Sequence, residues 1–178
     1  LSLHDALPIC RDNRSDLQMF GFYILNNVSI GFRTFASGFF VGLGSIFILI
    51  FNGITIGAVA GHLTVIGSGE TFWRFVVGHS GPELTAIVIA GAAGLRIGMA
   101  IVAPGRKKRV DALIEAGTVG VKMAMGIFAM LVFAAFIEAY WSSIVWVPDI
   151  VKYSVGGVIW VMIIVWLWRG GRGSEYAS

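Results

Sequence analysis

Long apolar stretches separated by short polar breaks dominate the pattern of this chain. A helix that crosses a bilayer needs about 20 mostly apolar residues. Residues 28–51 and 82–103 meet this length directly, and a helical pattern also runs from Asp111 to about Tyr140. A last apolar stretch, residues 155–168, is bracketed by tryptophans, which are enriched at membrane interfaces. The pattern therefore predicts an all-α, polytopic bundle of transmembrane helices.

The Gly-rich segment after the first predicted span is interrupted by small and polar residues. The Asn-Gly dipeptide at 52–53 favours a tight turn. Residues 54–66 are apolar but too short to cross a bilayer alone, and Gly67–Glu70 breaks the pattern again. Two interpretations of residues 54–77 stay open: a broken span that crosses, or a re-entrant hairpin shielded by protein. We expect it to cross.

Composition narrows the class of protein. The chain is 57% hydrophobic and only 13% charged, with 24 glycines and one cysteine in 178 residues. A soluble domain is typically about 25% charged. These values exclude a disordered chain, a disulfide scaffold and an ordinary soluble enzyme. They indicate a multi-pass protein of the cell (inner or plasma) membrane, surrounded by the lipid bilayer.

Basic residues predict the orientation. The run at 106–109, with Arg169 and Arg172, carries most of the loop charge, so these segments are expected on the cytoplasmic side. The same run accounts for most of the net charge of +3, which therefore gives no reason to expect a nucleic-acid partner. Residues 1–27 are expected outside if 54–77 crosses, and inside if it is re-entrant.

The first twenty residues form a separate segment, polar and without periodicity. Its opening, LSLHDALPI, resembles a translated sequencing adapter, so His4, Asp5 and Cys10 receive no functional weight. We expect residues 1–20 to be non-native or disordered, and the chain to be a fragment that lacks an upstream span. The predicted domains are this segment, a membrane domain at 21–168 and a cytoplasmic polar tail at 169–178.

Glycines recur four residues apart in three places, which puts each row on one helix face. Such rows allow helices to approach closely in lipid. The interpretations are packing within the bundle, a dimer seam, or a face that slides during transport. A Gly57→Leu substitution is expected to overpack the bundle in each case. The rows are Gly38 and Gly42; Gly53, Gly57 and Gly61; and Gly94 and Gly98.

Ionisable groups inside spans are costly, so each is a functional candidate by default. The densest set surrounds His79. Ser80 and Glu83 fit a capping box, but His79 and Glu83 also fit a proton-sensitive or ion-coordinating pair. Arg96 is expected to snorkel to the cytoplasmic side, and Arg33 to be within reach of the glutamates. The polar candidates are Asn26, Asn27, Asn52, His79, Glu83, Arg96 and Glu138.

Known catalytic motifs find little support. Residues 78–81, GHSG, fit the serine motif of rhomboid intramembrane proteases, but the required later histidine is missing. Three scattered histidines, without HExxH or clustered cysteines, predict no metal site. Nucleotide-binding loops are also absent from the sequence. We therefore expect no catalytic residues, cofactor or metal.

Four segments, in order, resemble the stage II sporulation protein M family of integral membrane proteins. They are YILNN, FASGFFVGLGSIFILIFNGITIGAVAG, GHSGPELTAIVIAGAAGLRIG and AAFIEAYW, within residues 20–168. Ser80 separates His79 from Gly81, where the family usually has His-Gly. The resemblance implies a membrane anchor for a peptidoglycan-degrading complex, and some members are suspected transport components.

Taken together, the expected function is a non-catalytic scaffold or anchor for a cell-envelope complex. Its partners would be other membrane or envelope proteins, with a homo-oligomer as a further option. The alternative is a subunit of a transporter or exporter permease. That alternative predicts a polar cavity lined by Glu83, Arg96 and Glu138.

Overall fold

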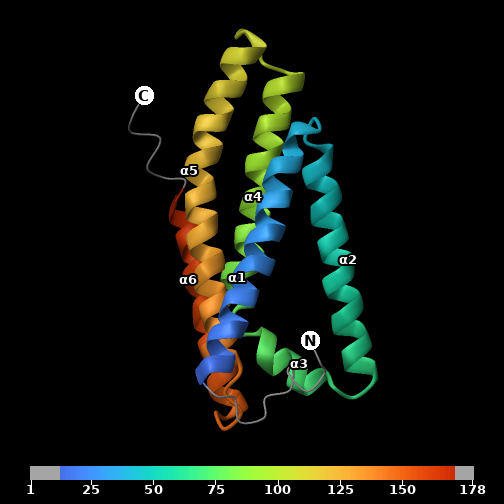
Figure 1. Ribbon diagram of the computed structural model, residues 1–178, viewed down its shortest axis with the longest axis vertical. Coiled ribbons are helices and arrows are strands. Elements are labelled where there is room, and N and C mark those ends of the chain that lie inside the picture. Colours follow the sequence, from blue (N-terminus) through green and yellow to red (C-terminus); the bar gives the residue numbers. More distant parts are fainter. Residues whose placement is uncertain (1–12, 171–178) are drawn as a thin grey trace.

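The computed structural model describes residues 13–170, and this part of the chain consists of helices joined by turns and loops, without strands (Figure 1). Long helices run alternately up and down, and one short helix, α3, crosses the lower end between α1 and α2. The elements are α1 (Asn13–Ala36), the 3₁₀ helix η1 (Ser37–Phe39), α2 (Leu43–Val65), α3 (Gly69–Val76), α4 (Ser80–Val102), α5 (Arg109–Phe136), the π-helix η2 (Ile137–Ser142) and α6 (Asp149–Gly170).

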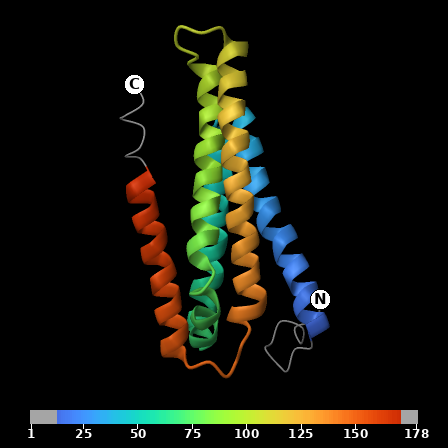
Figure 2. The same ribbon diagram turned by 90° about the vertical axis from the view of Figure 1, so that its left-hand side faces the viewer.

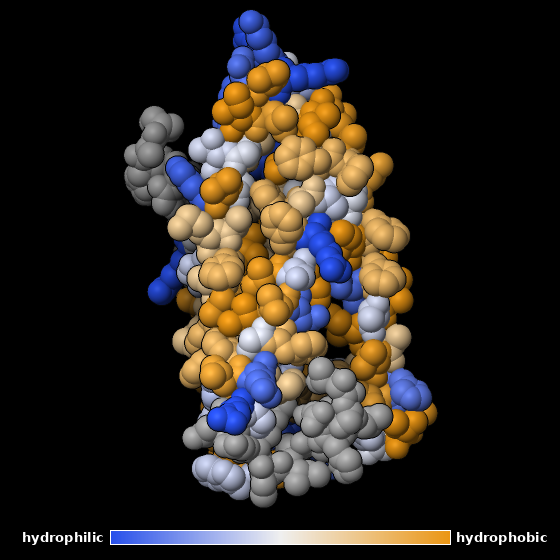
Figure 3. All heavy atoms as spheres, in the orientation of Figure 1, coloured by the Kyte–Doolittle hydropathy of each residue, from blue (hydrophilic) through white to orange (hydrophobic). Residues whose placement is uncertain are grey.

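The surface is that of a membrane protein. Within the described residues, α2, α4, α5 with η2, and α6 are long and apolar enough to cross a bilayer. Figure 3 shows hydrophobic residues over most of the visible face, with a group of hydrophilic ones at the turn between α4 and α5 and others scattered lower on the face. The predicted all-α, polytopic class is therefore confirmed. The chain is a multi-pass membrane protein.

Helix α4 is the central element. It packs on α1, α2, α5 and α6, and lies side by side with α5 over most of its length (Figures 1 and 2). Small residues make this possible, because Ala86, Ala90 and Ala93 are fully buried and let neighbouring backbones approach. Larger side chains, Ile97 of α4 and Leu131 of α5, fill the space that remains.

The prediction of one span at 28–51 is wrong. The chain reverses direction after α1, through η1 and a turn in which Val41 and Gly42 have positive φ angles of 60° and 80°. Hydropathy does not detect this turn because its side chains are apolar. Phe39 and Phe40 are more than half exposed and face the surroundings of the bundle, where lipid suits them.

The predicted turn at 52–53 is also wrong. Both residues lie inside α2, and the Asn52 side chain donates from Nδ2 to the Ile48 carbonyl at 3.0 Å. Residues 54–77 are therefore not one segment but the second half of α2, a turn and α3. The predicted break at 67–70 is confirmed for residues 67 and 68, since α2 ends at Val65 and Gly67 has a φ of 83°, whereas Gly69 and Glu70 already belong to α3.

This arrangement puts the start of α1 at the end of the molecule opposite the α4–α5 turn (Figure 1). Helix α1 begins at Asn13, so helical structure starts inside the segment predicted to be non-native or disordered. Arg169 and Gly170 likewise belong to α6 and not to a separate tail. His4, Asp5, Cys10 and residues 171–178 lie outside the described part of the chain.

Two of the three glycine rows pack inside the bundle. A Cβ at Gly38 would overlap the backbone of Gly94, and a Cβ at Gly98 would overlap the backbone of Gly42. The η1 turn therefore rests directly on α4. Ser45 strengthens the same corner by donating from its hydroxyl to the Thr34 carbonyl at 2.7 Å.

The third row does not pack inside the bundle. A Cβ at Gly53, Gly57 or Gly61 would meet no heavy atom of the described residues within 4 Å. Residues 53–59 of α2, which include two of these glycines, are all exposed. The expectation that Gly57→Leu overpacks the bundle is therefore wrong.

Candidate functional site

Three segments far apart in the sequence bring polar side chains together between α1, α4 and η2. Asn26 and Asn27 come from α1, His79 and Glu83 from the start of α4, and Glu138 from η2. One ligand atom each from His79, Glu83 and Glu138 lies within 4.8 Å of the other two. We call these five residues the polar site.

The start of α4 positions His79 and Glu83. His79 is the N-cap residue, and its carbonyl accepts the Glu83 backbone N–H at 3.2 Å. Residues four apart share a helix face, and His79 Nε2 lies 3.8 Å from Glu83 Oε2. The predicted pairing of these two residues is therefore present as a close contact.

The predicted capping box is wrong. The helix begins one residue earlier than that motif requires, so Ser80 is already helical, and no side-chain hydrogen bond caps α4. The Ser80 hydroxyl instead accepts a hydrogen bond from Trp160 Nε1 of α6 at 3.3 Å. Ser80 therefore ties α4 to α6 and leaves Glu83 available to the polar site.

Glu138 is held by the two asparagines and by an unusual helical turn. It lies in the π-helix η2, and such turns are rare and frequent at functional sites. Asn27, only 1% exposed, donates from Nδ2 to Glu138 Oε2 at 3.5 Å. Asn26 in turn donates from Nδ2 to Asn27 Oδ1 at 3.2 Å. The paired asparagines thus orient the Glu138 carboxylate from across the bundle.

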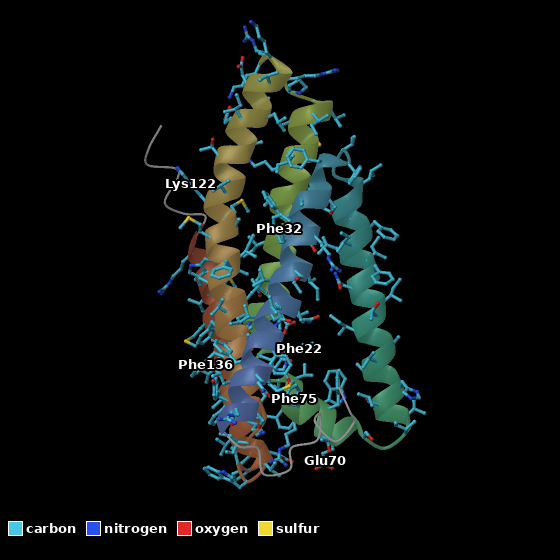
Figure 4. The ribbon with its side chains drawn as sticks, viewed as in Figure 1. Phe22, Phe32, Glu70, Phe75, Lys122 and Phe136 are labelled. Atoms are coloured by element: carbon cyan, nitrogen blue, oxygen red, sulfur yellow. The ribbon has the colours of Figure 1, made fainter. Side chains whose placement is uncertain are left out.

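The His79 ring is fixed from two sides. Its Nδ1 lies 3.2 Å from the Ser142 hydroxyl, and the ring packs edge-on against Phe75 of α3, labelled in Figure 4, with centroids 5.3 Å apart. His79 precedes the spanning range of α4, and its burial lowers the pKa to about 4. The imidazole is therefore neutral at pH 7, with Nε2 directed toward Glu83.

A cavity of about 250 Å³ adjoins the polar site. Its wall is polar where α1, α4 and η2 contribute, and largely apolar where α2 and α3 contribute. The residues that line it besides the polar site are Thr55, Ile56, Val59, Phe72, Val76, Ser80 and Leu84.

Other predicted polar residues lie elsewhere. Arg96 is exposed in the second half of α4 and does not line this cavity. The polar cavity predicted from Glu83, Arg96 and Glu138 is therefore lined by the two glutamates without the arginine. Arg33 is exposed on α1, and the ion pairs of the described residues do not join it to Glu83 or Glu138. Asn52 bonds within its own helix.

Sequence reasoning missed the support around Ser142. Lys152 of α6 is 2% exposed and donates from Nζ to the Ser142 carbonyl at 2.8 Å, which fixes the end of η2. A lone lysine beside an apolar stretch was a usable signal, because buried charges in spans are costly. The role of Ser142 had no local signal, since its partners lie 63 and 10 residues away.

Comparison with models of known protein families shows which family this chain belongs to. A family model described as Stage II sporulation protein M matches residues 9–143. The chain belongs to the stage II sporulation protein M family. The match includes all five residues of the polar site and ends just after η2. Comparisons with curated proteins and with solved structures gave no match.

Proposed function

We propose that this member of the stage II sporulation protein M family is a non-catalytic membrane scaffold, and that α2 is its assembly helix. In this proposal α2 binds a transmembrane helix of another cell-envelope protein. The basic α4–α5 turn faces the cytoplasm, in the inner or plasma membrane. No catalytic chemistry is assigned to the chain.

The open glycine face of α2 carries this proposal. A Cβ added at Gly53, Gly57 or Gly61 would have no neighbour within 4 Å among residues 13–170, although the same spacing at Gly94 and Gly98 supports tight packing. Helices in lipid associate through such small-residue faces because the backbones can approach closely. The face is also separate from the cavity, which α2 lines with Thr55, Ile56 and Val59.

Gly57→Leu is expected to weaken assembly while leaving the bundle folded. The leucine fills the open face and keeps the partner helix at a distance, without meeting any described neighbour. We expect about a tenfold loss of association, equivalent to about 1.4 kcal/mol. The measurement is site-specific photo-crosslinking from position 61 in native membranes, in a Cys10→Ser background, with and without Gly57→Leu.

Gly157→Leu on α6 is the matched control, since a Cβ at Gly157 would also meet nothing within 4 Å in the described part of the chain. It should leave the crosslink unchanged. A crosslink to a second copy of the chain would show that the partner of α2 is the protein itself, in a homo-oligomer. Crosslinks to lipid alone, equal in wild type and Gly57→Leu, would contradict the scaffold proposal.

A second candidate function is a subunit of a transporter or exporter permease. The observation that favours it is the cavity beside the polar site, since transport pathways use intramembrane glutamates and interrupted helices. This candidate predicts flux through the bundle, which the scaffold does not.

Glu138→Gln is expected to reduce such flux at least about tenfold, because it removes the charge that a passing cation or proton would need. The assay uses proteoliposomes containing the full chain, with a trapped pH dye and a trapped dye quenched by Mn²⁺. Glu70→Gln, on the exposed first turn of α3, is the control. Flux no greater than that of empty vesicles would exclude this candidate for both probes.

A further inference from the structure

We propose that His79, Glu83 and Glu138 together bind one divalent transition-metal cation, of the Zn²⁺ or Mn²⁺ class. The inference goes beyond both candidate functions and depends on neither. A resident ion that fixes the bundle and an ion in transit would use the same three side chains.

The donor set suits such an ion. Imidazole nitrogen and carboxylate oxygen are ligands of Zn²⁺ and Mn²⁺. At metal–ligand distances of about 2.1 Å, neighbouring ligand atoms lie about 3 to 3.5 Å apart. The three ligand atoms are already within 4.8 Å of one another, and His79 Nε2 is 3.8 Å from Glu83 Oε2. Small side-chain rotations would therefore complete the site.

The charges of the site also favour a cation. Two carboxylates so close together repel each other, and burial removes the water that would screen them. The ion pairs of the described residues give neither Glu83 nor Glu138 an arginine or lysine partner. The buried lysine nearby, Lys152, is directed to the Ser142 carbonyl. A divalent cation between the carboxylates would balance both charges.

A supporting layer already orients the proposed ligands. Metal-binding histidines almost always hydrogen-bond through their other ring nitrogen, and ligating carboxylates are themselves hydrogen-bonded. Ser142 occupies the first of these roles at His79 Nδ1, and Asn27 the second at Glu138 Oε2. Asn27 is thus a positioning residue and not a ligand.

The adjoining cavity supplies room for the rest of the coordination shell. Its volume is about 250 Å³, and a water molecule occupies about 30 Å³ in the liquid. Three protein ligands leave one or more positions open on Zn²⁺ or Mn²⁺, which water from this cavity can fill. The cavity reaches the site from the side of α2 and α3.

Equilibrium dialysis of the purified full chain in detergent tests the proposal, after chelator treatment and with ZnCl₂ or MnCl₂ as the probe. Wild type is expected to bind one ion per chain. Glu83→Gln and Glu138→Gln each remove a charged ligand, and we expect the affinity for the metal ion to fall by at least about tenfold. Asn27→Ala is expected to cost about tenfold through misorientation of Glu138.

Glu70→Gln and Glu115→Gln are matched controls, because both glutamates are exposed and neither lines the cavity. They should bind as wild type does. No saturable binding by wild type, or equal losses in controls and site variants, would overturn the proposal.

X-ray absorption of the Zn²⁺-loaded wild type keeps the test independent of whether the variants fold. The expected spectrum shows one imidazole nitrogen with oxygen ligands around the ion. A shell without imidazole would show that zinc binds elsewhere, and the proposal would then be wrong.

Discussion

Gly98→Leu is expected to prevent folding of the bundle, whereas the same substitution at Gly57 leaves it folded. The three atoms nearest to a Cβ at Gly98 all belong to the backbone of Val41 or Gly42, so no side chain can rotate away to relieve the overlap. Overpacking a core costs about 1 to 3 kcal/mol when side chains can adjust. Here two backbones must separate, so we expect a larger loss, one that exceeds the stability of about 5 kcal/mol of a marginally stable protein.

The measurement compares the yield of monodisperse protein and its thermal unfolding in detergent. Gly98→Leu and Gly57→Leu add the same side chain at glycines on two different helices, so lipid partitioning is matched. Equal stability of the two variants would mean that the η1 turn does not rest on α4. For the milder substitutions Gly98→Ala and Gly57→Ala, we again expect the variant at position 98 to be the less stable, with smaller losses of stability.

Leu131→Ala is expected to lower the free energy of unfolding by about 2 to 5 kcal/mol. Leu131 is 1% exposed, packs with Ala86, Ala90 and Ile127, and reaches the face of α1 at Gly31. The truncation therefore leaves a cavity at the junction of three helices. In lipid the loss is mainly of van der Waals contact, because lipid tails are as apolar as leucine.

Leu167→Ala is the control for this prediction, since Leu167 of α6 is 50% exposed and loses few protein contacts. Unfolding of both variants by a denaturing detergent, followed by circular dichroism, measures the difference. A Leu131→Ala loss as small as that of Leu167→Ala would contradict the packing of Leu131 between three helices.

The two predictions concern the same mechanical feature of the protein. Glycine contacts fix η1 and α1 against α4, and Leu131 fixes α5 against α1 and α4. These contacts set where Asn27, Glu83 and Glu138 lie relative to one another. A variant that loosens either junction is therefore expected to weaken the polar site without touching it.

The class of the protein and most of its spans follow from the amino-acid sequence. The helix predicted at 82–103 and the helical pattern from Asp111 to Tyr140 are confirmed, because each contains enough apolar residues to cross a bilayer. The family resemblance, which rested on several short motifs in order within residues 20–168, is confirmed by a family model that matches residues 9–143. Both signals are local and additive along the chain.

The first half of the chain is predicted less well. The apolar turn after α1 falls inside a predicted span, and the turn predicted at 52–53 lies inside α2. Hydropathy reports what a residue prefers to contact, and in lipid a turn and a helix can expose the same apolar side chains. Residues that favour turns, such as Asn52 and Gly53, do not interrupt a helix in lipid when the continuous helix satisfies every backbone hydrogen bond.

The geometry of the polar site depends on the tertiary structure. Five of the seven polar candidates meet at one site, and Arg96 lies away from it, but the sequence did not indicate that Asn27 reaches Glu138 across 111 residues. It also could not separate the packed glycine rows from the open row on α2, since all share the same spacing. Composition and periodicity fix which face of a helix is suited to contact, whereas the contact itself depends on how the other helices pack around it.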